Sequence, residues 1–305
     1  MAAEAVLRDL APVAGATAPT ARRGALGVFV RRVLRTRGAG FGLGVAICVV
    51  LVAAAADLLS PYSPAQQDYG AIMSPPNAAH WLGTDHLGRD NLSRIIYGSR
   101  VSIQAGVVSV GFAIVIGTTM GMLAGYWRGW IDDALMRLAD ALWSFPGIVL
   151  ALAIAAALGP GLTNAMLAIG IVFTPVFARL VRGSVLSVRE REFIFAARVI
   201  GANDARIMSR HVLPNVLGPI IVQASLLVAF AIIVEATLSF LGLGVQPPEP
   251  SWGSMLRTAY QYMQQAPWLS FFPGAAIFVT VLGLNLLGDG FRRALDPRLR
   301  TRGEA

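Results

Sequence analysis

The sequence contains no lysine, so all 25 of its basic side chains outside histidine are arginine. A Walker-type phosphate-binding loop needs a lysine that reaches the β- and γ-phosphates of the nucleotide. The chain therefore cannot hydrolyse ATP with that machinery.

Cysteine and histidine are also scarce. The single cysteine, Cys48, excludes an intrachain disulfide and a thiolate metal cluster. The histidines are His80, His86 and His211, and the topology described below puts the first two outside the membrane and the third inside. We therefore expect no metal or other cofactor in this chain.

Charged residues are also few. Only 14% of the residues are charged, against roughly a quarter in soluble domains, while 55% are hydrophobic and the mean hydropathy is +0.63. The net charge of +8 comes from arginines beside apolar runs rather than from a continuous basic surface, which argues against nucleic acid as a partner. The composition predicts an all-α polytopic membrane protein.

Six apolar runs are long enough to cross a hydrocarbon core of about 30 Å. They are residues 41–59, 101–126, 134–158, 162–180, 217–243 and 269–287. The third and fourth runs are joined only by Gly159, Pro160 and Gly161, so one re-entrant pair is the alternative. For the first run the alternative is a cleaved signal peptide, but its length of about twenty residues favours a retained anchor.

Arginine asymmetry predicts the orientation. External segments hold few arginines, and an even number of crossings would put both termini in the cytoplasm of a bacterial cell. The expected cytoplasmic arginines are Arg22, Arg23, Arg31, Arg32, Arg35, Arg37, Arg128, Arg182, Arg189, Arg191, Arg198, Arg206, Arg210, Arg292, Arg293, Arg298, Arg300 and Arg302; the external ones are Arg89, Arg94, Arg100 and Arg257. The expected division is a cytoplasmic tail (1–38), a membrane domain (39–291) with a long external loop (60–100) and a long cytoplasmic loop (181–216), and a cytoplasmic tail (292–305).

Three glycines, Gly117, Gly121 and Gly125, recur every four residues along the second run. This spacing removes side chains from one helix face and allows close approach of another helix. The contact could be a seam between two subunits or ordinary packing within this chain.

The cytoplasmic loop has the order helix, glycine, helix, proline. Ala196 and Ala197 lie on a helix that ends at Gly201, Asp204 falls in the first turn of the next helix, and Pro214 begins the return to the membrane. We expect an angled cationic projection with no hydrophobic stripe of its own to bury, whose small residues another protein can touch closely. A helix lying on the membrane surface is the alternative.

This loop resembles the EAA loop of bacterial ATP-binding-cassette importer permeases, in which a Glu-Ala-Ala, Gly, Leu-Pro spacing marks the helix that docks on the ATPase. Phe195 stands where the family usually has glutamate, so the polar contact of that glutamate is not implied here. The resemblance implies an ATPase-coupling role for Phe195, Ala196, Ala197, Arg198, Gly201, Ala202, Asp204, Leu213 and Pro214.

The external loop, from Leu82 to Ser102, resembles the corresponding stretch in C-type subunits of dipeptide, oligopeptide and nickel importers. In it, Asp90 can cap a helix, and Arg89 and Arg94 have Asp85 and Asp90 as nearby carboxylate partners. These four residues form either a lid or docking surface for a substrate-binding protein, or a structural plug that ties helices together.

Glu235 is an ionisable residue inside a predicted crossing, and such residues usually face protein or water rather than lipid. With Ser239 it is a candidate gate or pathway residue. The alternative is a buried carboxyl group that is hydrogen-bonded to a neighbouring helix and so fixes the packing.

The family resemblance covers nearly everything after residue 80 and implies a type I importer permease fold. It implies a subunit that forms half of the translocation pathway for dipeptides or oligopeptides, with a second homologous permease, two cytoplasmic ATPases and an extracytoplasmic binding protein as partners. Nickel complexes, glutathione or another small solute are alternative substrates. The rivals from other classes are an ion-coupled secondary transporter and a membrane-embedded enzyme, whose clustered carboxylates or catalytic groupings we do not find in the sequence.

Overall fold

The computed structural model describes residues 27, 33–34, 36 and 38–295. The expected tails therefore lie largely outside the described residues, as do most of their arginines. Within the described residues the chain is helical, and its one β-type pairing is an isolated bridge between Thr84 and Asp90. The all-α expectation is confirmed.

The helices follow one another with short connections, except for the segment between α4 and α5 and residues 241–251 between α11 and α12. In chain order they are α3 (Ala39–Ala54), α4 (Ala56–Leu59), the 3-10 turn η1 (Tyr69–Ala71), α5 (Asn91–Trp127), α6 (Gly129–Trp143), α7 (Gly147–Leu158), α8 (Leu162–Arg189), α9 (Glu192–Val199), α10 (Asp204–Ile207), the π-helical turn η2 (Met208–Val212), α11 (Leu213–Phe240), α12 (Trp252–Gln261) and α13 (Trp268–Leu295).

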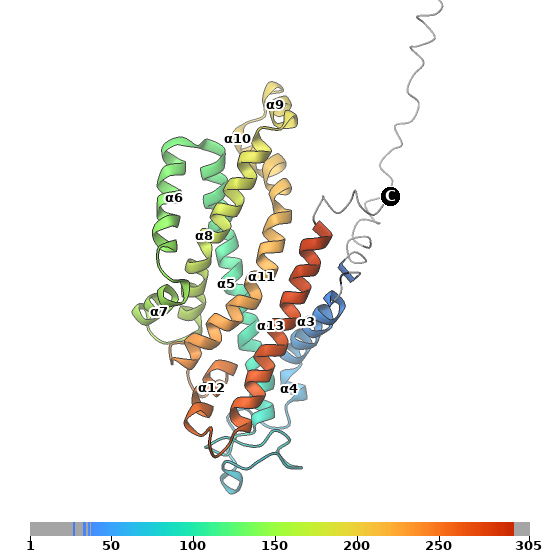
Figure 1. Cartoon of the computed structure of the whole chain (residues 1–305), viewed down its shortest axis with the longest axis vertical. Helices are drawn as coiled ribbons and strands as arrows, with labels where there is room; N and C mark the ends of the chain where they lie inside the picture. Colours follow the sequence, from blue (N-terminus) through green and yellow to red (C-terminus); the bar gives the residue numbers. More distant parts are fainter. Residues whose placement is uncertain (1–26, 28–32, 35, 37, 296–305) are drawn as a thin grey trace, which may run out of the picture.

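The long helices run side by side between two different ends of the molecule (Figure 1). One end carries α9 and α10, which stand out beyond the neighbouring helices; we call residues 190–212 the projection. The other end carries α12 and the segment between α4 and α5; we call it the loop end. The candidate residues of the cytoplasmic loop and those of the external loop therefore lie at opposite ends of the long helices.

Four of the six expected crossings are confirmed as long apolar helices. The runs 101–126, 162–180, 217–243 and 269–287 fall on α5, α8, α11 and α13, and each of these spans is long and apolar enough to cross a membrane. Proline inside α8, α11 and α13 is compatible with membrane helices, where neighbouring groups can satisfy the freed carbonyl.

The third crossing is not the single helix that the run 134–158 predicts. It is broken into α6 and α7, whose axes differ by 92°. Pro146 is the reason, because it has no amide hydrogen and disfavours helical geometry in the residue before it. The pair still connects the two ends, since α6 follows α5 at the projection end and the Gly161 amide bonds Leu243 O at 3.1 Å, just past α11. This arrangement fits a broken span. The re-entrant pairing of the third and fourth runs is not favoured, because the fourth run lies on α8, which is long enough to cross by itself.

The first crossing is shorter than expected. The run 41–59 forms α3, which has 16 residues and is about 24 Å long, and then α4 after a break at Ala55. Four helical spans, or five with the bent pair, therefore meet the length requirement in the described part of the chain, and α3 falls just below it.

Helices α5 and α8 are in backbone contact along the glycines of α5. A Cβ atom on Gly117 would stand 2.6 Å from Thr174 O, one on Gly121 would meet Ala178 O, and one on Gly125 would lie 3.0 Å from Arg182 O. Successive turns of α8 therefore occupy the space that side chains would take. Of the two interpretations of this spacing, packing within the chain is the one the structure adopts.

Replacing Gly121 with alanine should lower the stability of the protein, because the new methyl group would press on a helix backbone that cannot rotate away. We expect a cost of about 1–3 kcal/mol, seen as a lower unfolding temperature in detergent. Gly111→Ala is the matched control, since nothing lies within 4 Å of a Cβ there and alanine favours the helix. Equal unfolding temperatures for the two variants would contradict this account of the contact.

Candidate functional site

The projection has the expected helix, glycine, helix, proline order. Gly201 has a φ of 82°, a left-handed conformation that glycine adopts without strain, and it separates α9 from α10. The side chain of Asn203 caps α10 by accepting a hydrogen bond from the Arg206 amide at 2.9 Å. Leu213 and Pro214 begin α11, which continues without a break from α10 and η2.

The expectation that the projection has no hydrophobic stripe to bury is wrong. Ile194 and Ala197 of α9 and Ile207 of α10 are buried and belong to the same core cluster as α8 and α11. Ala197 is only 4% exposed, so it packs inside the chain and does not offer a surface to another protein. This buried stripe holds the projection at a defined angle to the helices beneath it.

The opposite side of α9 is apolar and exposed. Phe195 is 50% exposed, Val199 85% and Ile200 84%, and Ala196 lies exposed among them. These four residues, which we call the apolar tip, surround the left-handed turn at Gly201. A protruding apolar surface of this kind is suited to insertion into a groove of another protein.

The projection is anchored to α5 through Tyr126. The Tyr126 hydroxyl donates to Asp204 Oδ1 at 2.5 Å, and the Arg198 guanidinium lies over the Tyr126 ring, 5.7 Å from its centroid. Arg189 at the end of α8 donates to Tyr126 O at 2.6 Å. Asp204 and Arg198 therefore turn toward α5, and Tyr126, which the sequence analysis did not select, joins them.

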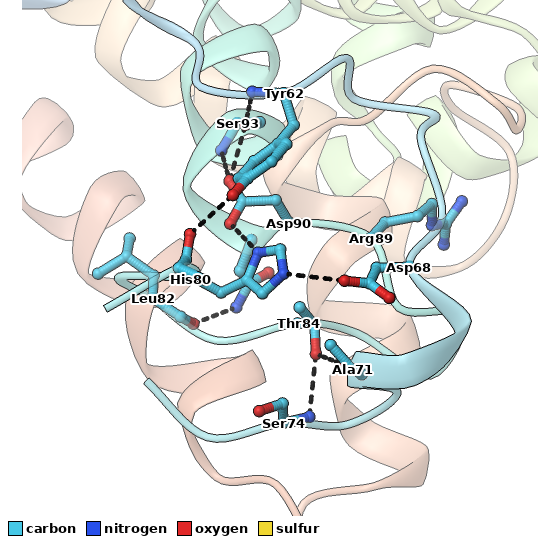
Figure 2. A network of polar contacts seen from close by, with 12 residues as sticks. Tyr62, Asp68, Ala71, Ser74, His80, Leu82, Thr84, Arg89, Asp90 and Ser93 are labelled. Carbon is cyan, nitrogen blue, oxygen red and sulfur yellow. Dashed lines mark hydrogen bonds and ion pairs between the residues drawn. The ribbon is translucent and has the colours of Figure 1, made fainter. Parts of the chain in front are cut away.

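At the loop end, Asp90 is the centre of a buried polar network (Figure 2). Its Oδ2 accepts hydrogen bonds from the Ser93 amide and hydroxyl, both at 2.7 Å, and so caps α5 as expected. Its Oδ1 lies 3.0 Å from His80 Nδ1. The Tyr62 amide bonds Ser93 Oγ at 3.2 Å, which fastens the segment after α4 to the same turn.

A second set of contacts centres on Asp85. Arg89 Nε donates to Asp85 Oδ2 at 2.7 Å, Arg94 lies 3.7 Å from the same oxygen, and Arg94 also donates to Pro64 O at 3.0 Å. Next to it, burial lowers the pKa of His86, whose ring stacks on that of Tyr262 beyond α12.

All four candidates of this loop are buried: Asp85, Arg89, Asp90 and Arg94 are 2–8% exposed. They cannot themselves form a docking surface in this structure. The structural alternative, a plug that ties the loop to the start of α5, fits their contacts.

Glu235 and Ser239 are brought together near the end of α11. Ser239 donates to Glu235 Oε1 at 2.6 Å, and the Val245 amide bonds Ser239 Oγ at 3.2 Å. Glu235 is completely buried, and Ser239 is 1% exposed. In this conformation the pair fastens the turn after α11, and the bond of Glu235 lies within its own helix rather than reaching a neighbouring one.

Two ion pairs between α6 and α8 were missed from the sequence. Arg182 binds both oxygens of Asp132 at 2.6 Å, and Arg179 binds Asp140 at 2.6 Å while its guanidinium lies 3.5 Å from the centroid of the Trp143 ring. The sequence held a signal for one of these pairs, because Asp140 and Arg179 are charged residues inside predicted crossings. The sequence does not show which residues pair or with what geometry, because this depends on how α6 packs on α8.

The bend between α6 and α7 borders an apolar cavity of about 330 Å³. Pro146 and Ile148 line one side of the cavity, and Phe173 of α8 and Phe230 of α11 line the other, with their rings stacked 5.9 Å apart. No local sequence pattern indicates this cavity, because it depends on the direction that α7 takes after the bend.

Comparison with known protein families gives two matches. Residues 117–301 match the family described as binding-protein-dependent transport system inner membrane component, and residues 25–76 match the N-terminal TM domain of oligopeptide transport permease C. The second match includes α3 and α4, although α3 is short.

Similar proteins include the dipeptide transport system permease protein of Alkalihalophilus pseudofirmus, which is 48% identical over 85% of this chain and 86% of that protein. The glutathione transport system permease protein of Pectobacterium atrosepticum is 47% identical over 90% of this chain and 91% of that protein. Among solved structures, the inward-facing MetNI methionine ABC transporter matches 67% of this chain and 97% of its own, with a TM-score of 0.55 and 20% identity. That likeness shows the fold alone.

Asp90→Ala should loosen the loop end, because it removes the α5 cap and leaves His80 without its buried partner. We expect a loss of about 2–3 kcal/mol and faster cleavage by trypsin after the now accessible Arg89 or Arg94. Asp133→Ala, which removes an exposed carboxylate from α6, is the control. Unchanged trypsin resistance in Asp90→Ala would show that the network does not hold the loop.

Glu235→Gln should keep both stability and transport close to the starting level, since an amide can still accept from Ser239. Glu235→Ala should destabilise the protein by about 1–3 kcal/mol through the lost bond and the cavity. The unfolding temperature and the transport rate of each variant provide the check. Loss of transport in a stable Glu235→Gln variant would favour the gate role instead.

Proposed function

Because the chain belongs to the family of binding-protein-dependent transport system inner membrane components, we propose that it forms half of the translocation pathway of an ATP-driven importer of dipeptides or oligopeptides. Its place among C-type permease subunits, expected from residues 82–102, is confirmed by the matches to oligopeptide and dipeptide permeases. It is a multi-pass inner-membrane transport subunit and not an enzyme. In our proposal two partner ATPases bind ATP and magnesium, and a second homologous permease completes the pathway.

The observation that carries the proposal is the apolar tip on a rigid projection. Phe195, Val199 and Ile200 are exposed together, while Ile194, Ala197 and Ile207 beneath them are locked into the core. A firmly held apolar surface is what a force-bearing contact with an ATPase requires. We therefore assign the docking contact to the apolar tip with Gly201, and a supporting role to Ala197, Ala202, Leu213 and Pro214.

The orientation that we propose puts the projection and both termini in the cytoplasm. Arginines gather at the projection end, and this distribution agrees with the preference of cytoplasmic segments for positive charge. The described arginines at that end are Arg128, Arg182, Arg189, Arg191, Arg198, Arg206, Arg210, Arg292 and Arg293. The same orientation exposes the loop end to an extracytoplasmic binding protein, and the match of residues 25–76 to an N-terminal TM domain favours α3 and α4 as the first crossing.

Movement of the ATPases would reach the pathway through Tyr126. A shift of α9 would act through Arg198 and Asp204 on Tyr126, and thus on α5. Because α5 is in backbone contact with α8, the two helices would move as one body. Differential binding of the ATPases to two arrangements of these helices would then decide which side of the membrane the pathway faces.

The substrate assignment rests on relatives. A dipeptide permease and a glutathione permease are similarly close to this chain, so glutathione, itself a peptide, is the second candidate. The apolar cavity beside Phe173 and Phe230 is of a size to accept an apolar side chain, which favours peptides over a nickel complex. The family assignment favours neither an ion-coupled transporter nor a membrane-embedded enzyme.

Replacing Phe195 and Ile200 together with aspartate should release the ATPases without unfolding the chain, because both side chains are exposed. We expect loss of more than nine-tenths of the co-purified ATPase subunits and of ATP-dependent peptide uptake, since charges would be buried in an apolar contact.

Phe195→Leu combined with Ile200→Val is the matched control and should retain both ATPases and uptake. The unfolding temperatures of the two double variants should agree. Full recovery of ATPases with the aspartate variant would exclude the apolar tip as the docking contact.

A further inference from the structure

A polar pocket of about 410 Å³ opens at the loop end, and neither the packing of this loop nor the proposed coupling makes use of it. Its polar side chains are those of Tyr62, Gln66, Gln67, Asp68, His80 and Asp90, several of which Figure 2 shows facing one another. The pocket lies directly over the Asp90 network described above. Its floor is therefore rigid.

The second ring nitrogen of His80 lies on the Asp68 side of the pocket. A carboxylate only accepts, so His80 Nδ1 is the donor to Asp90 at 3.0 Å. His80 Nε2 then points toward Asp68 Oδ2, 3.7 Å away. With a neutral imidazole, Nε2 and Oδ2 are both acceptors and cannot bond each other, and a donor that lies beside the pair can reach both.

The sum of charges in the pocket is negative in either protonation state of the imidazole. Asp68 and Asp90 contribute two negative charges, and His80 contributes one positive charge or none. The nearest arginines, Arg89 and Arg94, do not line the pocket and are engaged with Asp85. The pocket therefore attracts a cation.

Its shape and aromatic lining favour an ammonium group. The ring of Tyr62 lies 5.1 Å from that of His80, and Tyr69, which is 77% exposed, lines the mouth, so two aromatic faces can contact a cation. One nitrogen with three hydrogens can stand about 2.8 Å from both His80 Nε2 and Asp68 Oδ2. A guanidinium fork matches the two oxygens of one carboxylate instead.

We propose that this pocket receives the ammonium group of a lysine side chain from the extracytoplasmic binding protein. The surroundings favour a protein partner over the free substrate, because Tyr69 of the pocket lining is exposed, and Ile72 and Trp81 of the same loop are exposed apolar side chains as well. Aromatic residues of this kind are enriched at the centres of protein interfaces. The inference rests on the proposed function, since it assumes that such a binding protein docks at the loop end.

The test uses the complete importer in proteoliposomes with its peptide-loaded binding protein. Asp68→Asn removes the charge, while its amide oxygen can still accept from the Gly70 amide as Asp68 does at 2.9 Å. We expect the KM for the loaded binding protein to rise about three- to tenfold with an unchanged maximal rate, and the difference to shrink as salt concentration increases.

Glu249→Gln is the matched control, because it removes an exposed carboxylate from the segment between α11 and α12 at the same end. Its KM should stay within twofold of the starting value. An unchanged KM in Asp68→Asn, or an equal rise in both variants, would overturn the proposal.

Carbodiimide coupling identifies the source of the ammonium group. Since this chain has no lysine, an amide bond between Asp68 and a lysine, read by mass spectrometry, must come from another protein. We expect that lysine to belong to the binding protein. An amide with the amino group of the peptide substrate, or no amide at Asp68, would overturn the assignment of the partner.

The proposed function and the lysine pocket are refuted by different results. Absence of ATP-dependent uptake by the unaltered complex would refute the proposed function. Intact uptake with an unchanged KM in Asp68→Asn would refute only the lysine pocket.

Discussion

The contact between α5 and α8 is the constraint on which the rest of the structure depends. In a membrane, apolar side chains gain little by leaving lipid for protein, so helices associate through close packing and hydrogen bonds. Gly117, Gly121 and Gly125 let the backbone of α8 take the place of side chains on α5 over three successive turns. This contact makes the two helices one rigid body, and both functional ends are attached to that body.

At the projection end the attachment is Tyr126, one residue before the end of α5. It joins α9 and α10 to α5 by hydrogen bonds and an aromatic contact, while Ile194, Ala197 and Ile207 pack the projection onto the core. The projection is therefore rigid on its inner side and apolar on its outer side. A movement of a partner bound to the outer side is therefore passed on to α5, because the projection itself does not bend.

At the loop end the attachment is the cap of α5. Asp90 satisfies amide groups at the start of the helix and holds His80, so the segment after α4 is fastened to the same helix that receives the projection at its other end. The charges that made this loop conspicuous in the sequence are used internally, and the surface left for a partner consists of their exposed neighbours, Asp68, Tyr69 and Trp81. Buried polar networks of this kind are costly when incomplete, which explains why so many of these charges are paired.

The sequence by itself determined the all-helical membrane class, the four longest crossings, the glycine face of α5, the cap at Asp90 and the helix, glycine, helix, proline order of the projection. Each of these follows from residues close in the chain: apolar runs, four-residue spacing and the conformational preferences of glycine, proline and aspartate. Tertiary structure alone decided that Ala197 and the charged loop residues are buried, that Glu235 is buried and bonded to Ser239, and how far α7 turns away after Pro146. Those outcomes depend on contacts between distant segments, such as Tyr126 with Asp204 or Trp252 Nε1 with Ile95 O at 3.0 Å, and no local pattern specifies which face of a helix such a contact will cover.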